Sequence, residues 1–303
     1  MQWDQALKKK LIYGVAGGLL AILLILAAVI ASLNSGSSPG SVGETISGVS
    51  IPEGELLVED MYDGEKLIPK FDLPKNQYDM KKFIIRDGLT RYDDQKARLG
   101  VDVSEYQGNI DWAAVKAAGV DFAILRVGYR GMTQGLLNED SCFEQNFAGA
   151  TDAGIDVGVY FYSQAVTEAE ARAEADFVLK ILNQRNLTYP VVFDWESPTP
   201  TERLSAEDLR AYGMSGAEVT KIGTAFCEQV KEAGYTPCVY FNKHQAYNFF
   251  DLDQWKDYDM WYAEYARLPS MYYNYRMWQY TDEGQVPGID SGVDVNICFK
   301  PFS

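Results

Sequence analysis

The feature that most constrains this chain is an alternation of strand and helix patterns that begins at Leu99. Short apolar segments, each long enough for one strand, are separated by longer segments with helical periodicity. Such alternation predicts parallel strands, because a chain that returns to the same edge of a sheet needs a crossover helix. The predicted strands cover residues 99–103, 122–127, 157–162, 189–194 and 237–241, and the predicted helices cover 110–118, 143–153, 167–182 and 215–233.

Three further strand patterns, at 260–263, 277–280 and 293–296, follow with only short helical segments between them. Eight strands of parallel type with about five helices suit a closed barrel, so we predict an α/β fold, an irregular TIM-like (β/α)5(β)3 barrel, over residues 99–303. An open doubly wound sheet is the alternative fold. That alternative lacks its usual nucleotide site, because the sequence has neither a GxGxxG nor a GxxxxGK[ST] motif.

Acidic residues fall at the ends of several predicted strands, where barrel enzymes place their chemistry. Asp102 ends the first strand, Asp194 and Glu196 end the fourth, and Asp294 lies in the last. These residues are the candidate catalytic set.

Asp194 and Glu196 are two residues apart, and this spacing limits how their carboxyl groups can be arranged. Residues two apart in a strand point to the same face, and their Cβ atoms lie about 6–7 Å apart. Two carboxyl groups at that range can flank one glycosidic bond, one protonated and donating, the other ionised and stabilising positive charge. A solvated rim, a helix cap or a magnesium or calcium site would also explain acids at a strand end.

Other chemistries have little support in the sequence. His244 is the only histidine, so histidine-based zinc sites and Ser-His-Asp or Cys-His sites are unlikely candidates here. The formal charge of -16 argues against nucleic acid as a partner, since phosphate binding needs a positive surface. We expect no cofactor and no metal.

The N-terminal part carries a candidate membrane anchor. Residues 11–33 (Leu11 to Leu33) are apolar or small and uncharged, and about 20 such residues cross a bilayer. The preceding lysines, at 8–10, place residues 1–10 in the cytoplasm and the rest of the chain outside the cell membrane, as a single-pass protein. A cleaved signal peptide is the alternative, although its apolar region would normally be shorter.

Two segments join this anchor to the barrel. Residues 34–50 are rich in Ser and Gly and are expected to form a flexible linker. Residues 51–98 carry short apolar stretches that fit two or three strands, either as a small extension packed on the barrel or as a stalk. The four cysteines lack CxxC spacing, and the sequence leaves free buried thiols and one or two disulfides equally open.

Five motifs then occur in order along residues 99–303, and together they resemble glycoside hydrolase family 25, the muramidases also called Chalaropsis-type lysozymes. The resemblance says nothing about residues 1–98. The motifs are Gly100-Val-Asp-Val-Ser-Glu-Tyr-Gln-Gly-Asn-Ile-Asp-Trp, Phe122-Ala-Ile-Leu-Arg-Val-Gly-Tyr-Arg-Gly, Gly158-Val-Tyr-Phe-Tyr-Ser, Pro190-Val-Val-Phe-Asp-Trp-Glu, and Met277-Trp-Gln-Tyr-Thr with Gly292-Val-Asp-Val-Asn.

The resemblance implies a hydrolase that cuts peptidoglycan glycan strands at the β-1,4 bond after N-acetylmuramic acid. It implies that Glu196 is the general acid and Asp194 the partner carboxylate, with Asp102 and Asp294 lining the cleft. Arg126 is expected either to orient a cleft acid or to balance the acidic charge. The residues expected to line the sugar groove are Tyr160, Tyr162, Tyr240, Trp261, Gln279 and Tyr280, although buried packing is the alternative for each. With a membrane anchor, other envelope proteins are further candidate partners.

The anchor leads to a first prediction. We expect mass spectrometry of the mature protein to find residues 11–33 retained, because the apolar run is long enough to span the membrane and stay there. A mature N-terminus near Ser32 would instead identify the run as a cleaved signal peptide.

Overall fold

The computed structural model describes residues 45–46 and 49–302, which divide into two units on either side of the Glu53–Gly54 boundary. In the first unit, β1 (Thr45–Ile46) pairs with β2 (Val49–Ser50) as a short antiparallel ladder within the predicted linker. The predicted cytoplasmic segment and membrane helix lie outside the described residues. Among the residues described, no helix is both long and apolar enough to cross a bilayer.

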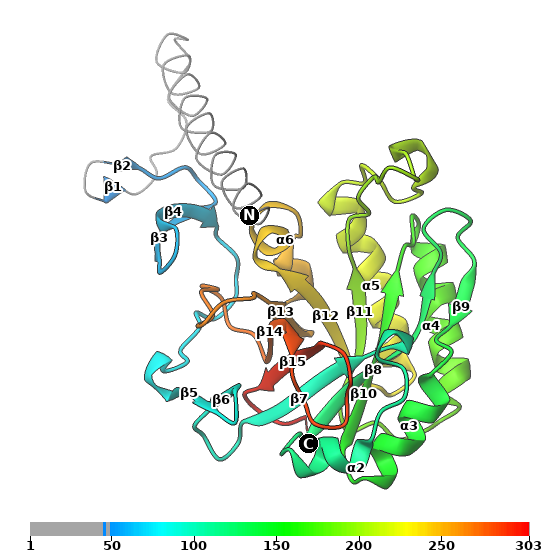
Figure 1. The fold of residues 1–303 in the computed structure, drawn as a ribbon. Helices are drawn as coiled ribbons and strands as arrows, with labels where there is room; N and C mark the ends of the chain where they lie inside the picture. The colour runs from blue at the N-terminus through cyan, green and yellow to red at the C-terminus, as the bar shows by residue number, and fades with distance from the viewer. Residues whose placement is uncertain (1–44, 47–48, 303) are drawn as a thin grey trace, which may run out of the picture. The chain divides into compact units, whose positions relative to one another are not determined.

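The second unit is built on a barrel (Figure 1). Nine strands form one sheet, and all except β9 close into a ring, because β8 pairs with β10 as well as with β7. In order around the ring the strands are β7 (Arg98–Val103), β8 (Phe122–Arg130), β10 (Asp156–Ser163), β11 (Val191–Trp195), β12 (Pro237–Asn242), β13 (Asp259–Ala263), β14 (Met277–Gly284) and β15 (Val293–Cys298). The predicted barrel is therefore confirmed, and β9 (Leu137–Glu139) pairs antiparallel with the end of β8.

The prediction of eight parallel-type strands is wrong for the last one. Strands β7 to β14 pair in parallel around the ring, whereas β15 is antiparallel to both β14 and β7. Residues 285–292 are too few for a crossover, which takes a dozen or more residues, so β14 can only turn back into an antiparallel neighbour. The barrel is mixed for this reason.

Helices cover one part of the outer face. They are α2 (Trp112–Ala117), α3 (Phe143–Asp152), α4 (Glu168–Leu182), α5 (Gly216–Glu232) and α6 (Lys243–Asn248). The two longest, α4 and α5, pack on each other and on β10, β11 and β12. Thr167 caps α4 by accepting from the N–H of Glu170 at 3.2 Å, and the Glu170 carboxylate accepts from the N–H of Val166 at 3.0 Å.

Residues 54–98 cover the side of the barrel that these helices leave open. Their elements are β3 (Glu55–Asp60), β4 (Gly64–Pro69), η1 (Met80–Lys82), β5 (Phe83–Arg86) and β6 (Leu89–Tyr92), which form two antiparallel hairpins joined by an irregular segment. The Phe83 ring meets Trp278 of β14 edge-on at 5.4 Å, and Tyr78 stacks on Phe299 at 3.8 Å. Ile68 and Leu89 are buried in the same apolar core as the barrel's outer face. Residues 54–98 thus pack against the barrel.

The interior of the barrel has an apolar lower layer. Side chains that alternate inward along the strands form a cluster of Phe122, Ile124, Tyr189, Val192, Cys238, Trp261, Met277 and Cys298. Gly100 lies beside Phe122, and a Cβ atom there would come within 2.3 Å of the ring. The ring cannot move aside easily, because it stacks on Tyr189 at 4.3 Å.

All four cysteines are free thiols in the structure. Cys227, Cys238 and Cys298 are buried, and Cys142 is partly exposed. Burial raises the pKa of the Cys298 thiol to about 11, so this thiol stays protonated and packs as a small apolar group.

The close approach at Gly100 gives a stability prediction. Gly100→Ala should lower the free energy of unfolding by about 1–3 kcal/mol, because the added methyl group overpacks the barrel floor. Gly131→Ala is the matched control: its nearest neighbouring atom would lie 3.7 Å from the new Cβ. Urea unfolding of both variants measures the difference, and equal midpoints would contradict the overpacking argument.

Candidate active site

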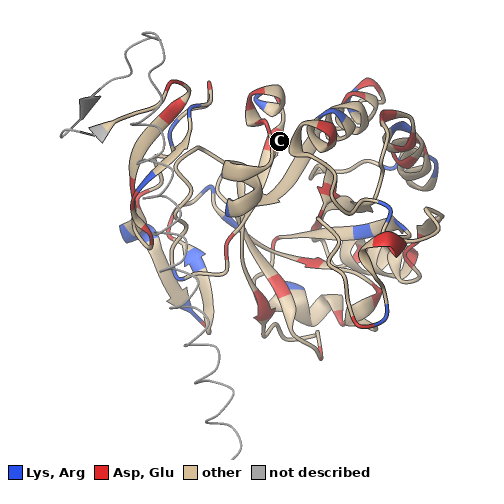
Figure 2. Ribbon diagram, turned by 90° about the horizontal axis from the view of Figure 1, so that it is seen from above, with Lys and Arg blue, Asp and Glu red and all other residues tan. Residues whose placement is uncertain are grey.

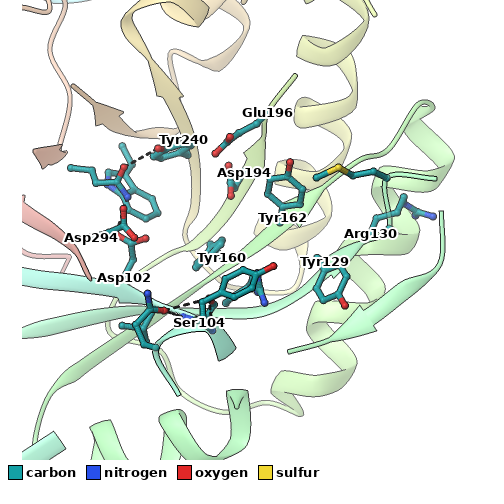
Figure 3. A pocket seen from close by; sticks show the side chains of 18 of the residues that line it. Asp102, Ser104, Tyr129, Arg130, Tyr160, Tyr162, Asp194, Glu196, Tyr240 and Asp294 are labelled. Atoms are coloured by element: carbon teal, nitrogen blue, oxygen red, sulfur yellow. Dashed lines mark hydrogen bonds between the residues drawn. The ribbon is translucent and has the colours of Figure 1, made fainter. Parts of the chain in front are cut away.

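A pocket of about 480 Å³ opens at the carboxyl ends of the barrel strands (Figure 3). The structure brings together here every candidate residue except Tyr280. The candidates that line it are Asp102, Arg126, Tyr160, Tyr162, Asp194, Glu196, Tyr240, Trp261, Gln279 and Asp294. They come from strands spread around the whole ring, so only barrel closure places them side by side.

Tyr280 does not line the pocket, so the prediction that it lines the sugar groove is wrong. Gln279 points into the barrel, so the next side chain on β14 points to the outer face. There the Tyr280 ring lies 5.5 Å from Trp278 and is buried beneath the hairpin extension. Tyr280 therefore belongs to the packing between barrel and extension.

Asp194 and Glu196 point into the same pocket from the end of β11 (Figure 3). Between them, Trp195 points outward and stacks on Phe249 at 5.6 Å. Glu196 follows the last residue of the strand, so the sheet does not hold its backbone. Two buried amide side chains take over this role: Gln245 Nε2 donates to the Trp195 carbonyl at 3.0 Å, and Gln164 Nε2 donates to the Glu196 carbonyl at 2.9 Å.

Both carboxyl groups have raised pKa values. Burial is the main reason that the pKa of Asp194 lies well above its usual range, and the negative charges of Glu196 and Asp102 add to the shift. Burial also raises the pKa of Glu196. Asp194 Oδ1 is buried without a hydrogen-bond partner among the described residues, so it is available to a ligand in the pocket.

Arg126 does not pair with any of the candidate acids. Its guanidinium donates to Asp140 at 2.7 Å and to Glu105 at 3.0 Å, and it lies over the rings of Tyr106 and Tyr129 at 4.9 and 5.2 Å. The Arg126 charge is thus mostly balanced at the rim, and the acids inside the pocket lack a direct cationic partner among the residues described. Because several carboxyl groups share this pocket without a paired cation, they cannot all be ionised together.

Asp102 is held by two amide groups. Its Oδ2 accepts from Gln279 Nε2 at 2.9 Å and from Asn296 Nδ2 at 2.7 Å. Burial raises the pKa of Asp102 to about 6, although these hydrogen bonds oppose the shift by favouring the charged form. Asp102 is therefore a fixed, mostly ionised acceptor at neutral pH.

Aromatic donors fix the two amides in turn. Tyr240 and Tyr265 donate to Gln279 Oε1 at 2.9 and 3.0 Å, and Trp261 Nε1 donates to Asn296 Oδ1 at 2.8 Å. With both amide oxygens occupied in this way, each amide can only present its N–H groups to Asp102. The network explains why these aromatic residues sit at the pocket wall.

Asp294 lies directly opposite Asp102 in the antiparallel pairing of β15 with β7. Burial, and then the charges of Asp102 and Asp282, raise the pKa of Asp294 to about 8. Asp294 thus carries a proton through much of the neutral range and can act as a hydrogen-bond donor.

Sequence reasoning does not single out several residues of the site. Asn296 does not line the pocket but holds Asp102 from behind, and it has the same two-residue spacing from Asp294 that links Asp194 to Glu196. Tyr265 lies two residues beyond the end of β13, and Tyr106, 78% exposed, lies just beyond β7. Strand-end position is the one signal that could have found the two tyrosines.

Across residues 45–46 and 49–302, no three His, Cys, Asp or Glu side chains are grouped in a way that could hold a metal ion. The carboxyl groups that line the pocket can supply proton transfer and charge stabilisation. His244 is exposed on α6, and its Nδ1 lies 3.3 Å from Asn248.

Comparisons with known proteins agree with this geometry. The sequence is similar to an autolytic lysozyme of Clostridium acetobutylicum, 27% identical over 202 residues that cover 65% of this chain and 54% of the relative. It is also similar to lysozyme M1 of Streptomyces globisporus, 26% identical over 208 residues, with 65% of this chain and 66% of that protein covered. The chain thus spans between about half and two thirds of the length of these relatives.

Solved structures show the same fold. The modular autolysin LytC of Streptococcus pneumoniae superposes with a TM-score of 0.58 at 24% identity, covering 82% of this chain and 57% of LytC. A family 25 glycosyl hydrolase of Bacillus anthracis superposes with a TM-score of 0.56 at 21% identity, covering 69% of this chain and 92% of that one.

The family model of the glycosyl hydrolases family 25 matches residues 101–289, a span that holds every pocket acid except Asp294. This match covers more than half of the chain, from the first barrel strand to the loop before the last. The chain belongs to glycosyl hydrolases family 25.

Proposed function

We propose that this protein hydrolyses peptidoglycan at the β-1,4 bond between N-acetylmuramic acid and N-acetylglucosamine. The observation that carries the proposal is the Asp194–Glu196 pair, a buried and a solvent-accessible carboxyl group that share one open pocket and have no cationic partner among the described residues. A pair of carboxyl groups across one bond is the arrangement that glycoside hydrolysis requires.

Glu196 is the general acid in this proposal. Desolvation in the pocket raises its pKa, which favours the protonated form that donates to the leaving glycosidic oxygen. It then accepts a proton from the attacking water. The two glutamine donors that fix the backbone at 195–196 keep this group in place between the two steps.

Asp194 is the stabilising carboxylate. Its unpartnered Oδ1 faces the pocket, where a positive charge develops on the sugar carbon as the bond breaks. Asp194 acts either on that carbon or on the N-acetyl group of the substrate itself, and the two alternatives use the same position. Asp102 and Asp294 line the opposite wall, where one accepts and the other donates hydrogen bonds.

The relatives support the choice of polymer. The matching curated proteins are an autolytic lysozyme and a lysozyme, and LytC has also been solved with a synthetic peptidoglycan ligand. For this chain we infer the same substrate class.

We further propose that the protein acts at the cell membrane as a single-pass protein. The apolar run at 11–33 supports an anchor with residues 1–10 in the cytoplasm and the barrel outside, where it reaches the wall and other envelope proteins. A tether raises the local concentration of the barrel at its polymer, which a net charge of -16 would not do.

Two other functions would use the same barrel. A glycan-binding scaffold would bind without turnover, and a hydrolase of another N-acetylated polymer, such as chitin, would release different products. Both are separated from the proposal by digesting purified peptidoglycan with the full chain and identifying new reducing ends. The full chain is needed because residues 54–98 supply part of the barrel's outer packing.

Replacing the proposed acid tests the mechanism. Glu196→Gln should reduce kcat on peptidoglycan by about a thousandfold or more, because the amide keeps the shape but has no proton to donate. Glu202→Gln is the matched control, as Glu202 is exposed in the following loop. Release of reducing muramic acid ends measures both, and unchanged turnover in Glu196→Gln would refute the assignment.

Asp102→Asn should have a smaller effect with a distinctive pH dependence. We expect kcat/KM to fall about tenfold, because the charge is lost while an oxygen remains to accept from Gln279 and Asn296. The charge of Asp102 raises the pKa values of Asp194 and Asp294, so its removal lowers both.

The acid limb of the kcat/KM profile, which reports ionisation of the Asp194 carboxylate, should therefore move to lower pH in Asp102→Asn. The exposed Asp290→Asn is the control, for which we expect the wild-type profile. Wild-type activity and an unshifted profile in Asp102→Asn would leave Asp102 with a structural role only.

A further inference from the structure

A second pocket of about 400 Å³ adjoins the first on the far side of Glu196. The two pockets share Glu196, Tyr240 and Tyr265, so they form one groove that passes across the proposed acid. The other walls of the second pocket are the start of α6, at residues 242–244, and the segment just after β13 at 263–264. A glycan chain cut at Glu196 must extend to both sides of that residue.

Lys243 in this wall is held by the N-terminal extension. Its ammonium group lies 2.6 Å from Asp60 and 3.1 Å from Asp63, both in the turn between β3 and β4, and 3.7 Å from Glu264. Asp60 is buried, and its Oδ1 also accepts from the N–H groups of Tyr62 and Asp63 at 2.9 and 3.0 Å. The turn is therefore built around the carboxylate that binds Lys243.

The same turn also holds the opposite wall of the second pocket. The Tyr62 hydroxyl donates to the Leu268 carbonyl at 2.9 Å and accepts from the Leu268 N–H at 3.1 Å. Glu264 accepts from the N–H and the hydroxyl of Ser270, both at 2.6 Å, which closes this segment on itself. Turn 60–63 thus connects the start of α6 to the segment 264–270.

The charges in this pocket indicate what it can hold. Lys243 is the only Lys or Arg among the described residues that line it, and its charge is balanced by the three carboxylates around it. An anionic ligand would therefore find no free cation here. The wall presents instead two tyrosines with the polar side chains of Asn242 and His244, which suits an uncharged sugar ring with hydroxyl and acetamido groups.

We propose that turn 60–63 of the extension is a positioning element of the substrate groove, and that the pocket it supports binds an uncharged N-acetylhexosamine unit of the glycan. The turn fixes Lys243 and the segment 264–270, and it keeps the Lys243 charge out of reach of the ligand. This inference rests on the proposed function, since it assigns one part of the groove to the sugar units of the glycan that lie beyond the cleaved bond.

Asp60→Asn in the full chain tests the inference. The amide still accepts from the backbone of the turn, but Lys243 loses the shortest of its three ion pairs, so its ammonium group is held less firmly and the wall loosens. We expect the KM for peptide-free glycan strands to rise about tenfold while kcat stays within about twofold, since the proposed acid is untouched. Asp72→Asn is the matched control: it breaks an exposed extension–barrel ion pair, Asp72–Lys256 at 2.9 Å, away from the groove, and KM should not change.

Tyr62→Phe provides a second variant, in case Asp60→Asn fails to fold. Tyr62 is 51% exposed, so the loss of one hydroxyl should leave the fold intact while it releases Leu268. We expect a rise in KM in the same direction and a melting temperature within a few degrees of wild type. Wild-type KM in Tyr62→Phe, or in a folded Asp60→Asn, would overturn the inference.

Equilibrium binding separates this inference from the proposed function. Calorimetry with soluble N-acetylglucosamine oligomers, on a Glu196→Gln background, reports binding without turnover. Weaker binding in the Asp60→Asn and Tyr62→Phe versions supports the role of the turn even if the wild type fails to cut peptidoglycan. Equal binding in all versions refutes that role even if the wild type is an active muramidase.

Discussion

Closure of the barrel is the constraint on which the rest of the structure depends. It forces every second side chain of eight strands into one enclosed space, where apolar residues fill the lower layer and carboxyl groups occupy the open end. Carboxyl groups confined in this way cannot all ionise, so burial and mutual repulsion raise the pKa values of Asp102, Asp194 and Asp294, and burial raises that of Glu196. Barrel closure, which packs the fold, therefore also favours the protonated carboxyl groups that the proposed chemistry uses. The charge of Arg126 opposes this shift at Asp194 only in part, because its guanidinium group is paired with Asp140 and Glu105.

Different segments of the protein cover different sides of the barrel. Long helices cover β10 to β12, and the β5–β6 hairpin of the extension covers β14, so this hairpin takes the place of a helix that the irregular barrel lacks (Figure 1). Acidic residues are spread widely over helices, strand ends and hairpins, in keeping with the net charge of -16 (Figure 2). A structural role for the extension and a role at the groove are compatible, because its β5–β6 hairpin packs on the outer face while its β3–β4 turn reaches the start of α6.

Much of the site followed from local pattern. Asp102, Asp194 and Glu196 could be identified because each emerges from a short apolar strand, and the two-residue period puts Asp194 and Glu196 on one face. The same period, applied to β14, would have excluded Tyr280, whose neighbour Gln279 already points inward. Arg126 shows the limit of such reasoning: its position was predicted, but its partners Asp140 and Glu105 lie on other segments whose approach depends on the loops.

The sequence by itself determined the order and type of the barrel elements and the strand-end acids, because hydrophobic periodicity and capping residues act over a few neighbouring positions. Only the tertiary structure decided that the last strand runs antiparallel, that residues 54–98 pack on the barrel, and that Gln164 and Gln245 hold the backbone around Glu196. These features join residues far apart in the chain, such as Asp60 with Lys243, and no local pattern reports such contacts. They exist because closure of the sheet brings distant strand ends together and leaves one outer face to be covered.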